Sequence, residues 1–419
     1  MTKGSTMTSI LITVATITIL ISATHRTFAQ ASTTNLYDGH LKKLDGSQLY
    51  HSSTELDQKL GISSSGTVVT QAGAPWPGSA YRALMWDGPL YNERINSNGQ
   101  REAYIFDNEV DQQDVRSEGM SYAMMIAVQA GDQYRFDLLH NFVLNHMKMS
   151  NGFIVYHVDR NGNNIDGYGF APDGDEWYTT ALIMAYHRWH NTSYINEAWG
   201  NLWQYANSGA MFDTNPKVVQ FNGNQLFDPS YLTPAFYLIW WNATGNNNSN
   251  YSNWMSWTGG DGACWNSVNQ SSRNLLNVSA QIGQSNGNGN TYLFHPNVSN
   301  LDGSVAGSYG GYGPDAMRTC MNAALDAQWY GQTNTYWRFC RDRQDYYFYA
   351  TPRQYSANGG VGELAMNTCA GEGYSWSDYN NEAGAFADKL WQASIPGDYY
   401  NAYIYYLGML VSTGRFKNY

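Results

Sequence analysis

The chain has 419 residues and a formal net charge of −11, with 34 acidic side chains against 23 basic ones. This length allows a large core, in one big domain or in two of ordinary size. The acidic balance argues against nucleic acid and against an anionic membrane as partners. Only 14% of the residues are charged while 15% are aromatic, so many amphipathic rings are available for packing or for stacking on a flat polar ligand such as a sugar.

Residues 1–29 have the features of a secretory signal peptide. Lys3 provides a weakly positive start, residues 10–21 are apolar except for Thr, and Ala29 ends a small-residue cleavage site. The apolar stretch is short for a membrane span, so an uncleaved anchor is the less favoured alternative. We therefore expect the mature chain to be secreted, extracellular or periplasmic, and to have no membrane contact after removal of the signal.

The next segment, residues 30–80, is rich in Ser, Thr and Gly and predicts a loosely ordered lead-in. A single domain is expected over residues 81–419, where apolar residues recur at helical spacing. Gly131 and Gly331 follow two of these patterns and act as C-terminal stops. The predicted helices are residues 118–131, 136–147, 175–189, 195–206, 229–241, 315–330, 382–392 and 398–411. The absence of alternating strand patterns and of a fixed repeat favours an all-α domain over a solenoid.

One long segment, residues 242–302, is rich in Asn, Gly and Ser and lacks periodicity. It is interpreted as a surface insertion rather than a linker, because helical patterns on both sides belong to one core. A nominal GxSxG around Ser285 has Asn/Gly-rich flanks, which are not those of a nucleophile elbow. The chain carries glycosylation sequons, whose use depends on the host, at Asn191, Asn242, Asn247, Asn250, Asn269, Asn277 and Asn297.

The cysteines are even in number, which permits disulfides in an exported chain. They are Cys264, Cys320, Cys340 and Cys369. The sequence does not choose among the three possible pairings, and a free core thiol at Cys320, on a predicted buried helix, fits equally well. There is no CxxC and no His/Cys cluster, so neither a metal nor another cofactor is expected.

Three acids share one placement, in a loop or first turn that leads into a predicted helix: Glu118, Asp173 and Asp315. An acid at a helix start is most often only a cap, because the helix dipole favours its charge there. Helices that start in the same direction would nevertheless gather the three acids at one end of a bundle. Two carboxyl groups in an aromatic cleft are what glycosidic hydrolysis requires, and no cofactor is needed.

The segment Asp114-Val115-Arg116-Ser117-Glu118-Gly119-Met120-Ser121-Tyr122 resembles the acid-bearing segment of glycoside hydrolase family 8, in particular of its xylan-active members. Four further segments resemble the family in the same order over roughly residues 80 to 419. They are residues 171–176 with His187-Arg188-Trp189, residues 228–237, residues 315–327 around Asp315-Ala316 and Arg318, and residues 398–417.

The resemblance implies an (α/α)6 barrel and an inverting mechanism. Glu118 would be the general acid and Asp315 the general base, standing about 6.5–9.5 Å apart so that a water fits between them. Asp173 would contact the sugar at the cleavage point, and Tyr231 and Arg318 would line the same subsite. Arg318 lies one helical turn after Asp315, where its charge would help to keep that base ionised.

Tyr122 and Trp177 are further candidates for substrate binding. Trp177, Tyr178, Trp240 and Trp241 are candidate sugar platforms, and core packing fits each of them at least as well. The sequence departs from the family pattern at Ala123, at Asp175-Glu176-Trp177-Tyr178 and at Pro314, and these departures concern the shape of the subsites.

A monomeric enzyme that cleaves β-1,4-linked xylan or xylo-oligosaccharides is therefore expected. Endo action and release of xylose from the reducing end share these motifs. A β-1,4-glucanase on the same scaffold and a non-catalytic carbohydrate-binding protein are the alternatives.

Overall fold

The computed structural model describes residues 35–109, 114–165, 167, 169–214, 217–221, 226–245, 263–307, 310–333, 335–373 and 380–419. The predicted signal peptide and its cleavage site lie outside these residues. Within them, no helix combines the length and the apolar character that crossing a bilayer requires.

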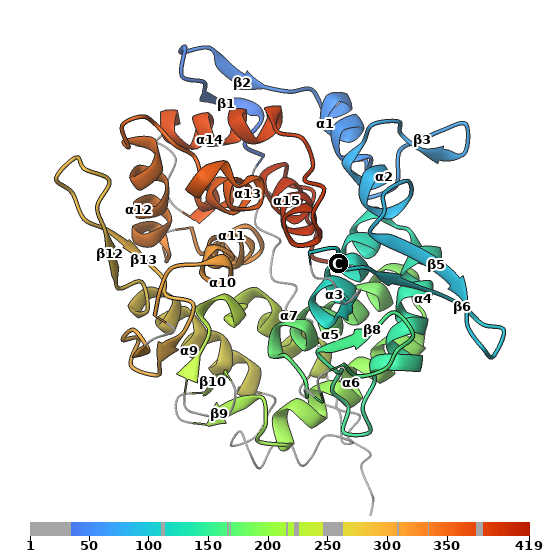
Figure 1. Ribbon diagram of the computed structural model, residues 1–419. Coiled ribbons are helices and arrows are strands. Elements are labelled where there is room, and N and C mark those ends of the chain that lie inside the picture. The colour runs from blue at the N-terminus through green and yellow to red at the C-terminus, as the bar shows by residue number, and fades with distance from the viewer. Residues whose placement is uncertain are drawn as a thin grey trace, which may run out of the picture.

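Six helices of the described chain form a closed inner ring (Figure 1). Each contacts the next in chain order, and the last returns to the first. In α3 every residue except Glu118 is buried, as expected for a helix surrounded by other elements. The inner helices are α3 (Ser117–Ala130), α5 (Pro172–Trp189), α7 (Pro234–Thr244), α11 (Thr319–Tyr330), α13 (Val361–Cys369) and α15 (Tyr399–Ser412).

A second layer of helices packs outside this ring. The outer helices are α2 (Ala80–Met85), α4 (Gln133–Phe142), α6 (Thr192–Asn207), α9 (Ala263–Val278), α12 (Trp337–Phe348) and α14 (Asn380–Gln392). Helix α4 contacts α3, α6 contacts α5, and α9 contacts α7, while α12 and α14 contact α13 and α2 contacts α15. Two concentric layers of alternating helices make an (α/α)6 barrel, which confirms the predicted fold class.

Short helical turns and two-stranded antiparallel pairs connect the barrel helices. The turns include α1 (Ser53–Leu60), the π-helical Val143–Met147, the 3-10 turn Pro229–Tyr231, α10 (Pro314–Met317), and the 3-10 turns Ala357–Gly359 and Ala370–Gly373. The pairs are β1 (Asp38–Lys42) with β2 (Gln48–Tyr50), β3 (Thr70–Gln71) with β4 (Ala74–Pro75), β5 (Tyr91–Ile95) with β6 (Arg101–Ile105), β7 (Asp114–Arg116) with β8 (His157–Asp159), β9 (Phe212–Thr214) with β10 (Lys217–Val219), β11 (Leu226–Phe227) with β14 (Ser299–Asn300), and β12 (Ile282–Gln284) with β13 (Tyr292–Phe294).

The lead-in is packed from residue 35 onward, which corrects the expectation of loose order for the described part of residues 30–80. Residues 30–34 lie outside the described residues. Leu36, Tyr37, Leu41, Leu49 and Leu56 are buried in a small cluster that includes two alanines of α14. Helix α1 has a complete capping box between Ser52 and Glu55. These apolar residues lack a regular period, and only the tertiary contact with α14 shows that they are core.

Residues 242–302 were expected to form a surface insertion, but the second half of this segment is part of the barrel. Helix α9 packs against α7 and buries Cys264, Trp265 and Val268. Ser285 follows β12 in a hairpin loop, so the GxSxG match has no strand-to-helix turn. The side chain of Asn269 is buried and donates to the Pro234 carbonyl at 2.7 Å, so this sequon is closed to a glycan.

Two predicted helices are each divided into two elements, one near Pro234 and the other at Arg318. The expected helix at 229–241 is divided, because Pro234 occupies the first turn of a new helix after the 3-10 turn. The expected helix at 315–330 is divided at Arg318.

All four cysteines are buried and free. The structure therefore contains free thiols in the core and no disulfide among these four residues.

Candidate active site

The three acids singled out by sequence lie in the first turns of α3, α5 and α10. The predicted convergence occurs, because all three contact one arginine. Arg318 follows α10 directly, and its side chain is 3% exposed. These helix starts therefore meet at one end of the barrel.

Arg318 uses both terminal nitrogens in this contact. Nη1 donates to Glu118 Oε1, to Asp173 Oδ2 at 2.9 Å and to the Tyr122 hydroxyl at 2.9 Å. Nη2 donates to Ser230 Oγ at 2.9 Å and to Asp315 Oδ1 at 3.1 Å. A planar guanidinium with a fixed set of donors holds the acids in one arrangement more firmly than a flexible ammonium would.

Glu118 has the electrostatics of a carboxyl group that titrates near neutrality. Its pKa is raised to about 7, chiefly by burial and further by the charges of Asp173 and Asp315, while Arg318 and the Tyr122 hydroxyl act in the opposite direction. Its side chain is 14% exposed, so one edge still reaches the surface. Burial thus outweighs the helix dipole, which favours the charged form at this helix start.

Asp315 is the most open of the three acids, with a side chain that is 46% exposed. The start of its helix is fixed from two sides: Asn297 Oδ1 accepts from the Ala316 amide at 3.1 Å, and the Tyr400 hydroxyl donates to the Pro314 carbonyl at 2.8 Å. Asp315 therefore combines a fixed backbone with access to water.

Asp228 is a buried acid near Asp315. It lies in the segment 228–237 that resembles the family, and the sequence analysis assigned it no role of its own. Burial raises its pKa well above the usual range, and the charge of Asp315 raises it further. Its Oδ1 accepts from the Ser230 amide at 2.7 Å. Asn322 donates to the Ser230 carbonyl at 2.7 Å, so Ser230, which binds Arg318, is fixed by two partners.

Glycines beside two of the acids permit close packing of the helix starts. A Cβ on Gly119 would lie 2.3 Å from Tyr399 Cε2, and one on Gly174 would lie 2.3 Å from Ser117 Oγ. Both distances are below van der Waals contact. The small residues that follow Glu118 and Asp173 therefore let α3 approach α15 and α5.

Strand β7 anchors the chain immediately before Glu118. Arg116 Nε lies 2.9 Å from Asp107 Oδ2, and Nη2 lies 3.3 Å from Asp114 Oδ2. The Arg116 Nη1 donates to the Tyr156 hydroxyl at 2.8 Å, and the Ser117 amide donates to the Tyr156 carbonyl at 2.8 Å. This network fixes the position from which α3 begins.

The aromatic candidates divide between the site and the core. Tyr231 and Tyr400 have their rings 5.8 and 6.0 Å from the Arg318 Cζ, and Tyr122 contacts both Arg318 and Glu118. Trp177 is only 2% exposed and packs edge-on against Tyr122 and Phe236, so the expectation of a sugar platform is wrong.

Several neighbours of the acids are structural. Tyr178 and Trp240 are buried, and Trp241 packs partly buried against the core. Asp175 accepts from the Tyr205 hydroxyl at 2.8 Å, and Glu176 accepts from the Tyr237 hydroxyl at 2.6 Å. The sequence analysis did not predict Ser230, Tyr400 or Asn322 as site residues, although all three lie in segments that resemble the family.

Comparison with known proteins gives consistent results. Residues 69–256 match the family model for glycosyl hydrolases family 8. The chain is 27% identical to the reducing-end xylose-releasing exo-oligoxylanase Rex8A of Paenibacillus barcinonensis over 77% of this chain and 86% of the relative. It is 27% identical to endoglucanase C of Ruminiclostridium cellulolyticum over 62% of this chain and 55% of the relative.

Solved structures show the same fold. A xylobiose complex of a mutant reducing-end-xylose releasing exo-oligoxylanase aligns with a TM-score of 0.67 and 25% identity, covering 81% of this chain and 91% of the other. A cold-adapted family 8 xylanase aligns with a TM-score of 0.66 and 26% identity, covering 81% and 90%.

Proposed function

We propose that this chain, which belongs to glycoside hydrolase family 8, cleaves β-1,4-xylosidic bonds in xylan or xylo-oligosaccharides with inversion. Glu118 is the general acid and Asp315 is the general base in this proposal. The observation that carries it is the pairing of a largely buried carboxyl, whose pKa is raised to about 7, with a solvent-accessible carboxyl across one arginine.

The raised pKa of Glu118 supports its role as acid, because a general acid must hold a proton near the working pH. In the proposed reaction Glu118 gives its proton to the glycosidic oxygen as the bond to the anomeric carbon breaks. The leaving sugar departs as a neutral alcohol, and Glu118 becomes a carboxylate that its ion pair with Arg318 stabilises.

The exposure of Asp315 supports its role as base, because a water must enter between this carboxylate and the sugar. That water attacks the anomeric carbon from the face opposite to the leaving oxygen, and Asp315 takes its proton. Solvent then removes the proton from Asp315 and returns one to Glu118. The two carboxyl groups and solvent water therefore supply and accept every proton that the reaction moves.

Asp173 and Tyr231 are proposed to bind the sugar at the cleavage point. Asp173 keeps a carboxylate oxygen on Arg318, so its direction is set before substrate enters. A fixed acceptor of this kind can bind sugar hydroxyls in the distorted ring of the transition state. Tyr122 is assigned to tuning Glu118 rather than to substrate contact, because its hydroxyl donates to Oε1 at 3.2 Å and the residue is buried.

The substrate proposal rests on the xylan-type segment around Glu118 and on relatives named as exo-oligoxylanases. A β-1,4-glucan is the second candidate, since other relatives are named endoglucanases. We further propose that a signal peptide at residues 1–29 directs the chain to the cell exterior or periplasm, where it acts as a monomer.

A product profile on both polymers tests the function. Purified protein is incubated with xylan, defined xylo-oligosaccharides and carboxymethylcellulose, beside the Glu118→Gln and Asp315→Asn variants. The proposal requires product from the xylose-based substrates with wild type and a large loss in both variants. If product forms only from carboxymethylcellulose, the substrate is a β-1,4-glucan and not xylan. Undiminished activity in the two variants would reject Glu118 and Asp315 as the catalytic residues.

A further inference from the structure

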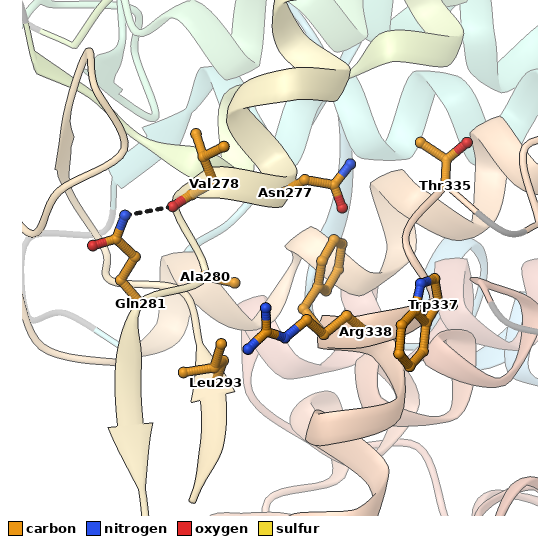
Figure 2. Close-up of a pocket in the computed structure, with 9 residues that line it drawn as sticks. Asn277, Val278, Ala280, Gln281, Leu293, Thr335, Trp337 and Arg338 are labelled. Carbon is orange, nitrogen blue, oxygen red and sulfur yellow. Dashed lines mark hydrogen bonds between the residues drawn. The ribbon is translucent and has the colours of Figure 1, made fainter.

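A second candidate binding region lies on the outer layer of the barrel. A cavity of about 460 Å³ opens between the end of α9, the β12–β13 hairpin and the start of α12 (Figure 2). Its size is within the range of about 300–1,000 Å³ that small-molecule sites occupy. The elements that form it carry none of the acids of the candidate active site, which belong to α3, α5 and α10. Figure 1 shows the hairpin at the edge of the barrel.

The cavity has an apolar floor and a polar rim. Ala280 and Phe339 are buried at its base, and Leu293 is partly buried beside them. The rim carries the exposed or partly exposed Trp337, Arg338, Thr335, Asn277 and Gln281 together with the exposed Val278, and none of these residues is acidic. A largely apolar cavity with a few polar groups is typical of small-molecule binding sites.

Trp337 is unusual among the described tryptophans. Among the tryptophans that the structure describes, only Trp337 and Trp86 are exposed, at 49% and 41%. The ring of Trp86 is covered by the Arg135 guanidinium, whose Cζ lies 4.1 Å from the ring centroid. Within the described residues no cation covers the ring of Trp337, and its side chain lines the cavity. An uncovered indole on a water-exposed rim is suited to stacking against the apolar face of a sugar ring.

The rim amides also favour a ligand that carries hydroxyl groups. Gln281 Nε2 donates to the Val278 carbonyl at 2.7 Å, shown as a dashed line in Figure 2, and Asn277 Nδ2 donates to the Arg273 carbonyl at 3.1 Å. These bonds direct one amide N–H of each side chain to the backbone and leave the carbonyl oxygens as acceptors. Carbonyl oxygens accept from hydroxyl donors, and the remaining N–H of each amide can donate to a hydroxyl oxygen.

We infer that this cavity, called the α9–α12 pocket, is a secondary carbohydrate site that holds a segment of the β-1,4-linked polysaccharide, with Trp337 as its stacking platform. The inference rests on the proposed function for the identity of the polymer. Binding one part of a long chain here would raise the effective concentration of that chain near the active site. Short oligosaccharides, which cannot reach both places, would gain nothing.

Retention on insoluble xylan tests the pocket. The full chain carrying Glu118→Gln is produced in a bacterial host, so that turnover is suppressed and Asn277 carries no glycan. Adding Trp337→Ala is expected to weaken retention about three- to tenfold, the size of a lost ring-stacking contact. Trp337→Tyr keeps a ring and should retain most of the binding. Trp86→Ala, which removes an exposed indole elsewhere, is the matched control and should bind like the parent.

A second variant and a kinetic comparison keep the result interpretable. Gln281→Ala with Arg338→Ala removes rim contacts without altering the buried floor, and it should also weaken retention. With Glu118 intact, Trp337→Ala should lower hydrolysis of insoluble xylan and leave kcat/KM on xylotriose unchanged. Equal retention by the Trp337→Ala protein and its parent, at equal melting temperature, would overturn the inference.

Failure of the proposed function would have a different signature. If wild type releases no sugar from xylan and yet Trp337-dependent retention persists, the pocket stands and the catalytic proposal falls. If xylan is hydrolysed and retention does not depend on Trp337, the catalytic proposal stands and the inference about the pocket falls.

Discussion

Arg318 donates through Nη1 to Glu118, a residue 200 positions earlier in the chain. The same guanidinium also binds Asp173 and Asp315, so one cation links the first turns of three helices. The proposed acid and base contact different nitrogens of this group. The two carboxyl groups are thereby held in one site without sharing a donor nitrogen.

Glu118→Gln removes the transferable proton and keeps the size of the side chain. We expect kcat/KM on xylo-oligosaccharides to fall about a hundredfold to ten-thousandfold, the range of general acid catalysis. The matched control is Glu55→Gln, which changes an acid in the first turn of α1 that forms a capping box and has no contact with the three acids of the site. Steady-state assays should show near wild-type rates in the control, and similar losses in both would count against a specific role for Glu118.

The pH profile should have a basic limb set by Glu118. Its pKa is raised to about 7, so the carboxyl is protonated below that pH and kcat/KM should decline as pH rises through it. The Tyr122 hydroxyl lowers this pKa by donating to the charged form. Tyr122→Phe should therefore move the basic limb to higher pH.

A remote phenol provides the control for that shift. Tyr194→Phe also removes a phenol hydroxyl that contacts a carboxylate, here Asp137 on the outer helix α4, and neither residue contacts the three acids of the site. Initial rates across the pH range should show no displacement in this variant. If the basic limb of the pH profile moves to lower pH in the Tyr122→Phe variant, that limb does not belong to Glu118.

Arg318→Lys keeps the charge and loses the planar fork that contacts three acids. Loss of a charged hydrogen bond costs about 1.5–3 kcal/mol, so we expect kcat/KM to drop about tenfold to a hundredfold. Arg273→Lys is the control, because Arg273 forms a two-point contact with Asp326 at 2.8 and 2.7 Å, between α9 and α11. The control should affect chemical denaturation more than catalysis, whereas comparable kcat/KM losses in both variants would deny Arg318 a special role.

Trp177→Ala should act on stability because the indole is core. Replacing a buried Trp by Ala costs about 3–5 kcal/mol of unfolding free energy, and Trp177 packs against Tyr122 and Phe236 with ring centroids 4.9 and 4.8 Å away. Trp177→Phe should recover most of the loss in urea denaturation and leave KM unchanged. A raised KM with unchanged stability would restore the sugar-platform interpretation.

The sequence was informative where local pattern and function coincide. Helices α3, α5, α6 and α15 follow from apolar periodicity, and Glu118, Asp173, Asp315 and Arg318 follow from their positions in recognised segments. Their convergence could be expected because helix starts in such a bundle gather at one end. The family resemblance, rather than spacing alone, assigned the barrel.

Other features depend on tertiary contacts that no local pattern reports. Ser230 acquires its role only because Arg318 reaches it from another element. Trp177 is the right type for a sugar platform, and the packing of α7 beside it decides otherwise. Helix α9 lies in a stretch whose Asn/Ser-rich composition hides an amphipathic face that is buried against α7.

The anomeric configuration of the first product is the most direct test of the central claim. Xylohexaose is mixed with a high concentration of wild-type protein, and proton NMR spectra are recorded before mutarotation equilibrates the new reducing end. Direct attack by an Asp315-activated water on a β-linked substrate predicts that the α-anomer forms first. Initial accumulation of the β-anomer would contradict the assignment of Glu118 and Asp315 as an inverting pair.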